Sequence, residues 1–550
     1  MIKFRTAAPD ARRPLRVPCT MLLVTLVLSA CGGSDDAPAA ATVKISDATT
    51  RCAALVGVKV AASAFALSTG GATFTAAAVV PSAPASGAAA ATPEYCKVTG
   101  SIAAAQASDP SILYQVNLPS DWNYKTVQFG GGGTNGTVIT GTDNVVNAGS
   151  AVTPLQRGYV TFGGDSGHQG GGSEFFLSDT ATANYGKQSV KKTKDLATAL
   201  IQAYYKTAQK RNYYIGHSKG GQEGLHAAQD YAADYDGVMA YYPAAQFGSL
   251  VLSWYRLWDT AYSTPGAALN QAKLTLLQTA VRTACDSLDG VADGIVSNLE
   301  ACKVAFSVQT LRCAGGADTG DTCLSDKQIA TLDVGASQMS FAFPMPNGIS
   351  SVGPWPMYNL GDLNFIFSAT GLGTDSIYYI AFLPGDVKYA FVGDANAPVT
   401  GFDYRLYKSR VDRMTSLYDA SNPNVDTFVN KGGKLLLVHG TTDLLVPTSM
   451  TTAYYNSLGA RYGSKLKDFA RYYIAPGFGH GSGAFTLQWD SLTALDNWVE
   501  TGKAPESPVV TDGSAATKGR TRPLCEYPGW PRFNGTGDAA VAASYTCVAS

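Results

Sequence analysis

The sequence is poor in charge and in histidine. Only 15% of its 550 residues are charged, its formal net charge is −1, and it contains five histidines. This balance gives no reason to expect a nucleic-acid partner, and the lack of a fixed-period repeat argues against a solenoid. Abundant glycine, at 58 residues, and tyrosine in excess of phenylalanine, at 29 against 21, favour a loop-rich α/β protein.

Residues 1–31 have the pattern of an export signal. Arg12, Arg13 and Arg16 precede the apolar run "MLLVTLVLSA" (21–30), which is too short to span a bilayer and is followed by Cys31 and a polar tail. Residues 28–31 resemble a bacterial lipobox, which implies a lipid on Cys31 as the only membrane anchor. Gly32 in the next position favours an outer-membrane lipoprotein, and an ordinary signal peptide with secretion is the alternative.

Cysteine use agrees with export. Without the signal segment and Cys31 the chain keeps an even number of cysteines, which in an exported protein indicates disulfides. Close spacing favours three pairs and leaves a fourth by elimination, although other pairings stay open. The pairs are Cys285 with Cys302, Cys313 with Cys323, Cys525 with Cys547, and Cys52 with Cys96.

The chain reads as one α/β domain interrupted by an insertion. Strand-like runs such as "ILYQVNLP" and "GYVTFGGD" alternate with helical patterns over 97–247, and the alternation resumes over 426–550. This order predicts a mostly parallel sheet with helices on both faces. Residues 248–425 hold few clean strands and are predicted to form a lid. Residues 32–96 are predicted to be a linker and a peripheral, irregular segment with at most one strand, within 62–92.

The stretch "YYIGHSKGGQEGL" (213–225) contains the pattern GxSxG. A strand-like run precedes Ser218 and a helical pattern follows it, which is the context of a nucleophile on a tight strand-to-helix turn. Gly216 and Gly220 leave room around the serine. The turn also places the Lys219 N–H at a helix N-terminus, where it is expected to donate to an oxyanion.

A serine nucleophile needs a base, and the base needs an acid. His480 follows a strand in the glycine-rich loop "APGFGHGSG", and Asp443 ends "LLLVHGTTD", also just past a strand. Ser218, Asp443 and His480 are therefore the predicted triad. A second oxyanion donor is expected from "FGGGGTNG" (129–136), with Gly130 preferred and Gly131 next.

A second cluster lies in the predicted lid, in "CDSLDGVADGIVSN" (285–298). Asp286, Asp289 and Asp293 are close together, and glycines follow two of them. Carboxylates and freed backbone carbonyls suit a calcium ion. The spacing is not that of an EF-hand, and an Asp/Gly-rich turn that binds nothing is the alternative.

These motifs resemble the tannase and feruloyl esterase family, which includes mono(2-hydroxyethyl) terephthalate hydrolase. The similarity extends from about Cys52 to Cys547, through "GGGGTNG", "GHSKGGQEGL", "CDSLDGVADGIVSN", "GGKLLLVHGTTD" and "APGFGHGSG". The resemblance implies an α/β-hydrolase core with a large lid, the same triad and a structural calcium. It adds the carbonyls of Val291 and Ile295 to the calcium ligands; no organic cofactor is expected.

One departure from the family pattern concerns the catalytic loops. Family members usually carry a disulfide that joins the residue before the serine to the residue after the histidine, and these places are His217 and Gly481 here. The chain is therefore expected to be a divergent member whose catalytic loops are held by packing.

The resemblance narrows the substrate only to small aromatic-acid esters of the feruloyl or galloyl type. The lid stretch 373–399 contains no arginine to pair with a substrate carboxylate, which weighs against terephthalate monoester as the preferred substrate. Tyr378, Tyr379 and Phe382 are candidates for an aromatic wall, or else belong to the lid core. A polyester-related esterase and an inactive, surface-anchored binding protein are the alternatives, and the oligomeric state stays open.

Overall fold

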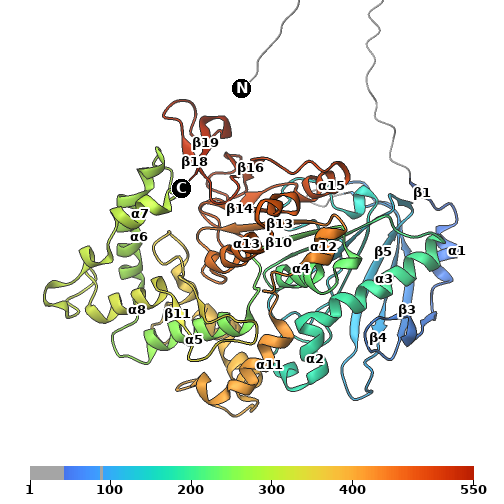
Figure 1. Ribbon diagram of the computed structural model, residues 1–550, viewed down its shortest axis with the longest axis horizontal. Helices are drawn as coiled ribbons and strands as arrows, with labels where there is room; N and C mark the ends of the chain where they lie inside the picture. Colours follow the sequence, from blue (N-terminus) through green and yellow to red (C-terminus); the bar gives the residue numbers. More distant parts are fainter. Residues whose placement is uncertain (1–41, 87–90, 550) are drawn as a thin grey trace, which may run out of the picture. The chain divides into compact units, whose positions relative to one another are not determined.

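A ten-stranded mixed sheet runs through the computed structural model, which describes residues 42–86 and 91–549 (Figure 1). The strand order is β14-β13-β10-β9-β7-β8-β5-β4-β3-β2. The strands from β14 to β8 are parallel and those from β5 to β2 are antiparallel. The strands are β2 (Lys59–Val60), β3 (Ala72–Val80), β4 (Tyr95–Ile102), β5 (Ile112–Pro119), β7 (Lys125–Phe129), β8 (Val160–Gly164), β9 (Arg211–His217), β10 (Gly237–Tyr241), β13 (Lys434–Gly440) and β14 (Ala470–Ala475).

Both faces of the parallel part are covered by helices, as the sequence predicts. Because successive side chains of a strand point to opposite faces, each central strand contributes to two cores. In β10, Val238 and Ala240 pack in the same cluster as α4 (Lys219–Gln229), whereas Met239 packs with α15 (Ser491–Thr501). The strands are apolar on both sides for this reason, and the predicted α/β architecture is confirmed.

The carboxyl ends of four of the parallel strands lie at one edge of the sheet. β9 ends at His217, directly before Ser218, and β7 ends directly before the glycine loop 130–136. β13 and β14 end three and five residues before Asp443 and His480. Loops at this edge are where open α/β sheets bind ligands.

The segment between β10 and β13 contributes no strand to the described part of this sheet. It is mostly helical, and in Figure 1 its helices α5 to α8 lie away from β3 and β4. The lid boundaries predicted at 248 and 425 fall beside the starts of α5 and α12. The helices are α5 (Phe247–Tyr262), α6 (Gln271–Cys285), α7 (Leu299–Ala305), α8 (Asp326–Ala336), α9 (Ile377–Ala381), α10 (Leu383–Gly385), the π-helical η10 (Asp386–Val392), α11 (Lys408–Tyr418) and α12 (Asp426–Asn430).

The prediction for the segment before 97 is partly wrong. β3 falls where one strand was allowed, but the segment also supplies β2 and belongs to the main sheet, with β3 paired to β4 along most of its length. Phe74 of β3 is 1% exposed. The small alanine and threonine side chains of β3 give a weak strand signal, because the stability of β3 comes from pairing with β4 and not from its own hydrophobicity.

The cysteines form the four pairs that close spacing favours. One bond joins α1 (Ala48–Ala53) to β4, and two lie in the lid, one of them at the acidic stretch. The fourth joins the C-terminal hairpin β18–β19 (Trp530–Phe533 and Tyr545–Val548) to the chain before it. The bonds are Cys52–Cys96, Cys285–Cys302, Cys313–Cys323 and Cys525–Cys547.

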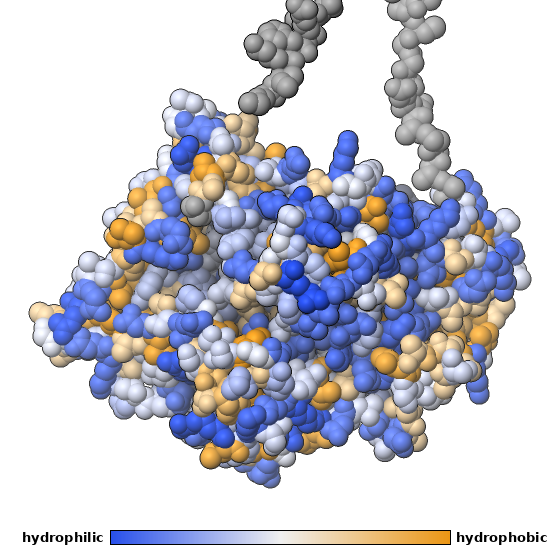
Figure 2. All heavy atoms as spheres, in the orientation of Figure 1, coloured by the Kyte–Doolittle hydropathy of each residue, from blue (hydrophilic) through white to orange (hydrophobic). Residues whose placement is uncertain are grey.

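The predicted signal segment and Cys31 lie outside the described residues. Within the described part, no helix is both long and apolar enough to cross a membrane. On the face seen in Figure 2, apolar and polar side chains are interspersed.

Candidate active site

Ser218 stands on a strained turn between β9 and α4. Its φ and ψ are 54° and −121°, a conformation that a residue with a side chain rarely adopts and that is typical of a strained functional turn. The flanking glycines are required by space: a Cβ on Gly216 would lie 2.2 Å from the Gly220 carbonyl oxygen, and one on Gly220 would lie 2.6 Å from that of Gly131. The chain therefore crowds glycine here so that backbone can pack under the serine.

Asp443 and His480 are hydrogen-bonded to each other. His480 Nδ1 lies 2.8 Å from Asp443 Oδ2, and the other carboxylate oxygen accepts the N–H groups of Leu445 and Val446 at 2.8 and 2.9 Å. The acid is fully buried. Burial alone raises the pKa of Asp443, but His480 and His439 beside it outweigh burial and hold that pKa well below its usual range.

The Ser218 hydroxyl has no hydrogen-bond partner among the described residues. The link between nucleophile and base is often long before substrate binds and tightens in the complex. Between the two residues' segments lies Tyr242, whose ring centroid is 4.5 Å from that of His480 and 5.8 Å from that of His217. The three predicted residues are thus gathered at one edge, with His480 oriented by the acid.

The prediction that the Gly130 N–H donates to the oxyanion is wrong. Its N–H donates to the Ile215 carbonyl at 2.9 Å, which continues the ladder between β7 and β9 beyond the last residue of β7. The next N–H, that of Gly131, donates to Glu223 Oε2 at 3.2 Å. Gly133 lines the same cavity as Ser218 and Lys219, and its N–H has no hydrogen-bond partner within the described chain.

A buried ion pair fixes the glycine loop against α4. Glu223 accepts from Lys219 Nζ and from the Tyr214 hydroxyl, each at 2.7 Å, in addition to the Gly131 N–H. Burial raises the pKa of Glu223, yet the Lys219 ammonium and these donors outweigh it and lower that pKa. Removing one partner of such a pair leaves a buried charge uncompensated, so this network is a structural support for the loop.

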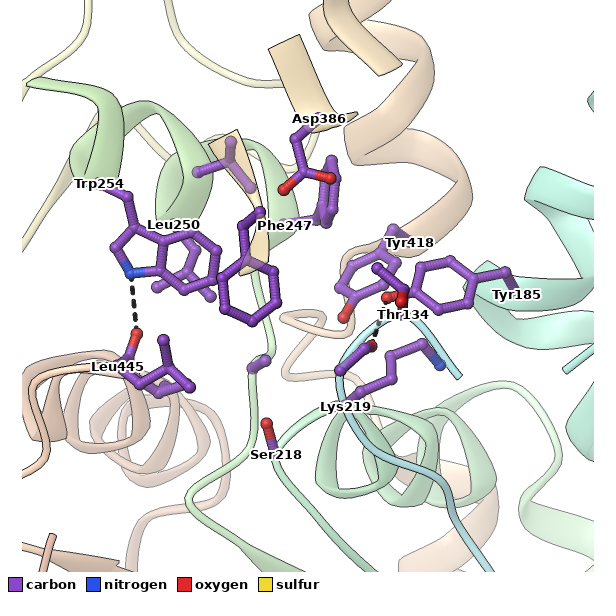
Figure 3. Close-up of a pocket in the computed structure, with 15 residues that line it drawn as sticks. Thr134, Tyr185, Ser218, Lys219, Phe247, Leu250, Trp254, Asp386, Tyr418 and Leu445 are labelled. Carbon is purple, nitrogen blue, oxygen red and sulfur yellow. Dashed lines mark hydrogen bonds between the residues drawn. The ribbon is translucent and has the colours of Figure 1, made fainter. Parts of the chain in front are cut away.

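A small cavity opens above Ser218 (Figure 3). Aromatic rings from the core and the lid form much of its wall, and one carboxyl group, that of Asp386, also lines it. The lining includes Gly133, Thr134, Tyr185, Lys219, Ala244, Phe247, Leu250, Val251, Trp254, Phe382, Asp386, Tyr418, Leu445 and Val446.

Of the three residues predicted to form an aromatic wall of the substrate site, one lines the cavity. Phe382 lines the cavity, with its ring 4.7 Å from that of Trp254. Tyr378 is completely buried and donates its hydroxyl to the Leu444 carbonyl, and Tyr379 packs on Trp258 at 5.1 Å. Neither tyrosine lines the cavity, because the short helix α9 turns both toward the lid core.

Sequence reasoning missed most of the cavity wall. Phe247 and Trp254 lie on α5, Trp254 within the run "SWYRLWDTAY" and Phe247 shortly before it. The high aromatic content of this run was the signal in the sequence that could have pointed to the cavity wall. Trp254 Nε1 donates to the Leu445 carbonyl at 2.9 Å, so the lid helix also holds the loop that carries Asp443. Asp386 had no sequence signal.

A larger groove lies elsewhere in the described structure. It is lined by lid and core residues such as Phe306, Trp355 and Tyr358, but by none of the predicted triad. The smaller cavity at Ser218 is therefore the candidate active site.

The predicted calcium residues lie in one loop, but their side chains do not converge. Asp286 Oδ1 accepts from the Asp293 and Gly294 N–H groups, and Asp293 forms ion pairs with Arg522 and Arg520. Across residues 42–86 and 91–549, no group of three His, Cys, Asp or Glu side chains is arranged to hold a metal ion. Asp289 is 2% exposed, and burial raises its pKa to about 6.

Comparisons with known proteins agree on one family. Its profile, described as tannase and feruloyl esterase, matches residues 96–548. An uncharacterized esterase of Agrobacterium fabrum is 37% identical over 478 residues, covering 83% of this chain and 86% of the relative. The mono(2-hydroxyethyl) terephthalate hydrolase of Piscinibacter sakaiensis is 30% identical over 532 residues, covering 85% and 87%.

Solved structures share the fold. Feruloyl esterase B from Aspergillus oryzae matches with a TM-score of 0.76 at 22% identity, over 91% of this chain and 100% of that one. Tannin acyl hydrolase from Aspergillus niger matches with a TM-score of 0.67 at 20% identity, over 87% and 92%. At these identities the likeness concerns the fold alone.

Proposed function

We propose that this chain, which belongs to the tannase and feruloyl esterase family and is a carboxylic ester hydrolase, is exported and uses a serine nucleophile to hydrolyse esters of small aromatic acids. The observation that carries the proposal is the 2.8 Å hydrogen bond between His480 Nδ1 and Asp443 Oδ2, at the same sheet edge as Ser218. The other end of the imidazole is then free to act on the serine hydroxyl.

In the proposed mechanism Ser218 Oγ attacks the ester carbonyl while His480 Nε2 takes its proton. Asp443 holds the imidazole in the tautomer with a proton on Nδ1 and stabilises the imidazolium. His480 then returns the proton to the leaving alcohol, and water hydrolyses the acyl enzyme by the same route. We assign the oxyanion to the N–H groups of Lys219 and Gly133, since the N–H of Gly130 is committed to the sheet.

The aromatic lining supports the substrate class. Phe247, Trp254 and Phe382 provide flat apolar surfaces, which favour an aryl acyl group over a flexible chain. The named relatives include a feruloyl esterase B and a hydrolase of mono(2-hydroxyethyl) terephthalate. A terephthalate monoester is the second candidate because of the latter relative, but it carries a carboxylate, and the ammonium in the cavity wall, that of Lys219, is paired with Glu223.

Export is part of the proposal and has its own support. Four disulfides are typical of an oxidising compartment. The lipid on Cys31 and the outer-membrane location follow only from residues 28–32. Metabolic labelling with a fatty-acid analogue tests them: wild type is expected to be labelled, and labelling that persists in Cys31→Ala contradicts the anchor.

Calcium is proposed as a structural ion of the lid loop. Asp289 supports it, because its buried carboxylate accepts the Val291 N–H but forms no ion pair within the described chain, and a bound cation would offset the cost of burying its charge. The fit is partial, since Asp293 already pairs with Arg522 and Arg520. Asp286, Asp289 and the carbonyls of the loop would supply oxygen ligands, and the ion would hold the loop without entering the reaction.

Active-site labelling tests the catalytic proposal. A fluorophosphonate should modify wild-type protein and leave Ser218→Ala unmodified, and hydrolysis of methyl cinnamate should fall by at least about a thousandfold in that variant. Ser287→Ala, in the lid loop, is the matched control and should behave as wild type. Equal labelling of Ser218→Ala and wild type contradicts the assignment of the nucleophile, and an unreactive wild type supports a binding protein that has lost turnover.

A further inference from the structure

Asp386 is a buried acid without a partner. It begins the π-helical segment η10, its side chain belongs to a residue that is 1% exposed, and its N–H donates to the Phe382 carbonyl at 2.9 Å. Its carboxyl group makes no hydrogen bond or ion pair with any described residue. Burial raises the pKa of Asp386 well above its usual range and so favours the uncharged carboxylic acid.

This acid faces the candidate active site. Asp386 and Ser218 line the same cavity, and Figure 3 shows the carboxyl group turned toward Phe247, on the side of the cavity opposite Ser218. The only ammonium among the described lining residues is that of Lys219, which is 2.7 Å from Glu223. Buried polar groups in folded proteins are nearly always hydrogen-bonded, so an unpaired one in a cavity wall points to a partner on the ligand.

The chemistry of the wall limits what that partner is. An uncharged carboxyl group both donates and accepts a hydrogen bond, and so does a phenolic hydroxyl. The rings of Phe247, Trp254 and Phe382 line the same cavity, and in Figure 3 Phe247 lies between Asp386 and Ser218. An aryl ring among them, with its ester carbonyl at Ser218, would point its far substituent toward Asp386.

On the basis of the proposed function, we propose that Asp386 determines substrate specificity by hydrogen bonding to a hydroxyl group on the aromatic ring of the acyl moiety. A ring without this hydroxyl leaves the buried carboxyl group unpaired, which is the situation that produces strong discrimination. A substrate carboxylate at the same place would meet an acid and no free cation, so the same residue disfavours terephthalate monoesters.

The test is a ratio of two substrates. For wild type, Asp386→Leu and Asp386→Asn, kcat/KM is measured on methyl 4-hydroxycinnamate and on methyl cinnamate, and the first value is divided by the second. The ratio does not depend on the fraction of folded enzyme, so a poorly folding variant remains informative. Asp394→Leu, an exposed acid in the same lid segment, is the matched control.

We expect a ratio of roughly ten or more in wild type and in Asp394→Leu, since one lost hydrogen bond in a buried site costs about that factor. Asp386→Leu should bring the ratio close to one, through loss of activity on the hydroxylated ester. Asp386→Asn keeps a donor and an acceptor and should retain more than about a threefold preference.

Three outcomes overturn the inference: a wild-type ratio near one, a ratio unchanged in Asp386→Leu, or a preference lost equally in both Asp386 variants. A wild-type preference for terephthalate monoester over both cinnamates also overturns it. Failure of the proposed function looks different, because then neither aromatic ester is hydrolysed in a Ser218-dependent way.

Discussion

A single aromatic side chain, Tyr242, connects the segments that carry the nucleophile and the base. Its ring packs against His480, His217 and Phe478, with centroids 4.5, 5.8 and 5.8 Å away. A Cβ at Gly481 would lie 3.3 Å from its hydroxyl. Aromatic pairs contribute about 0.5–1.5 kcal/mol each and a disulfide about 2–4 kcal/mol. This packing therefore offsets a good part of the stability that a disulfide between the catalytic loops, as the family resemblance implies, would supply.

His217 precedes the nucleophile, where the family resemblance implies a cysteine, and its surroundings favour the neutral imidazole. Burial, together with the nearby His480, lowers the pKa of His217 to about 4. In the unfolded chain the group titrates near 6.5. As pH falls from about 6.5 to about 4, the unfolded chain therefore binds a proton that the native protein does not, and stability is lost over that window.

We predict that His217→Gln reduces the loss of stability between pH 7 and pH 5 by up to about 2 kcal/mol, so that the melting temperature falls less over this range than in wild type. Thermal melts of both proteins at several pH values measure it. The acid limb of kcat/KM should stay where it is in wild type, because a neutral His217 takes no part in proton transfer. A variant with an unchanged pH slope would mean that His217 titrates freely in the native protein.

At the same scale, the sequence reveals a residue when its chemistry needs a special backbone. Ser218 is found from its glycines, and Asp443 and His480 from their places after strands. Gly130 fails because the register of β7 and β9 extends one residue further than the strand-like pattern, and that extension uses its N–H. Asp386 is invisible to pattern reasoning, since only the packed cavity distinguishes it from any lid acid.

Among the elements, parallel strands and their covering helices are predictable because they combine β-branched or aromatic runs with amphipathic helices. β9 and β13 lie where the sequence places them. β3 gives only a weak signal because pairing, and not composition, makes it a strand. The π-helical turn of η10 depends on tertiary contacts, and it is this turn that brings Asp386 to the cavity.

The acidic lid loop between α6 and α7 gives an element-scale prediction. Excess calcium should raise the melting temperature by a few degrees over protein in chelator, since an ion at about 100 times its Kd contributes about 2.7 kcal/mol. The reason is the buried Asp289, whose carboxylate lacks a cation. Asp289→Asn should abolish the response, and the exposed Asp394→Asn should keep it.

An unchanged melt of wild-type protein in calcium and in chelator would contradict the ion. In that case Arg522 and Arg520 already serve as the cations of the loop through Asp293. Arg522→Ala would then lower the melting temperature without restoring a calcium response.

For the whole molecule, the lid and the catalytic core share one hydrophobic interior. A single buried cluster includes Tyr214 and Leu435 of the sheet together with Trp254 and Tyr378 of the lid. Hydrogen bonds from these two lid residues to the Leu445 and Leu444 carbonyls add to it. The sequence separates two regions by their patterns, but contacts across such a boundary depend on three-dimensional packing and leave no periodic signal.

We therefore predict one cooperative unfolding transition that disulfide loss in either region shifts. Cys52–Cys96 closes 44 residues at the sheet and Cys313–Cys323 closes 10 in the lid. Chain-entropy reasoning gives losses of about 4 and about 3 kcal/mol for the paired alanine variants. Differential scanning calorimetry should show a single peak for wild type and both variants, lowered most for Cys52→Ala with Cys96→Ala. If only part of the peak moves in the lid variant, the lid unfolds on its own, and the shared interior does not couple it to the active site.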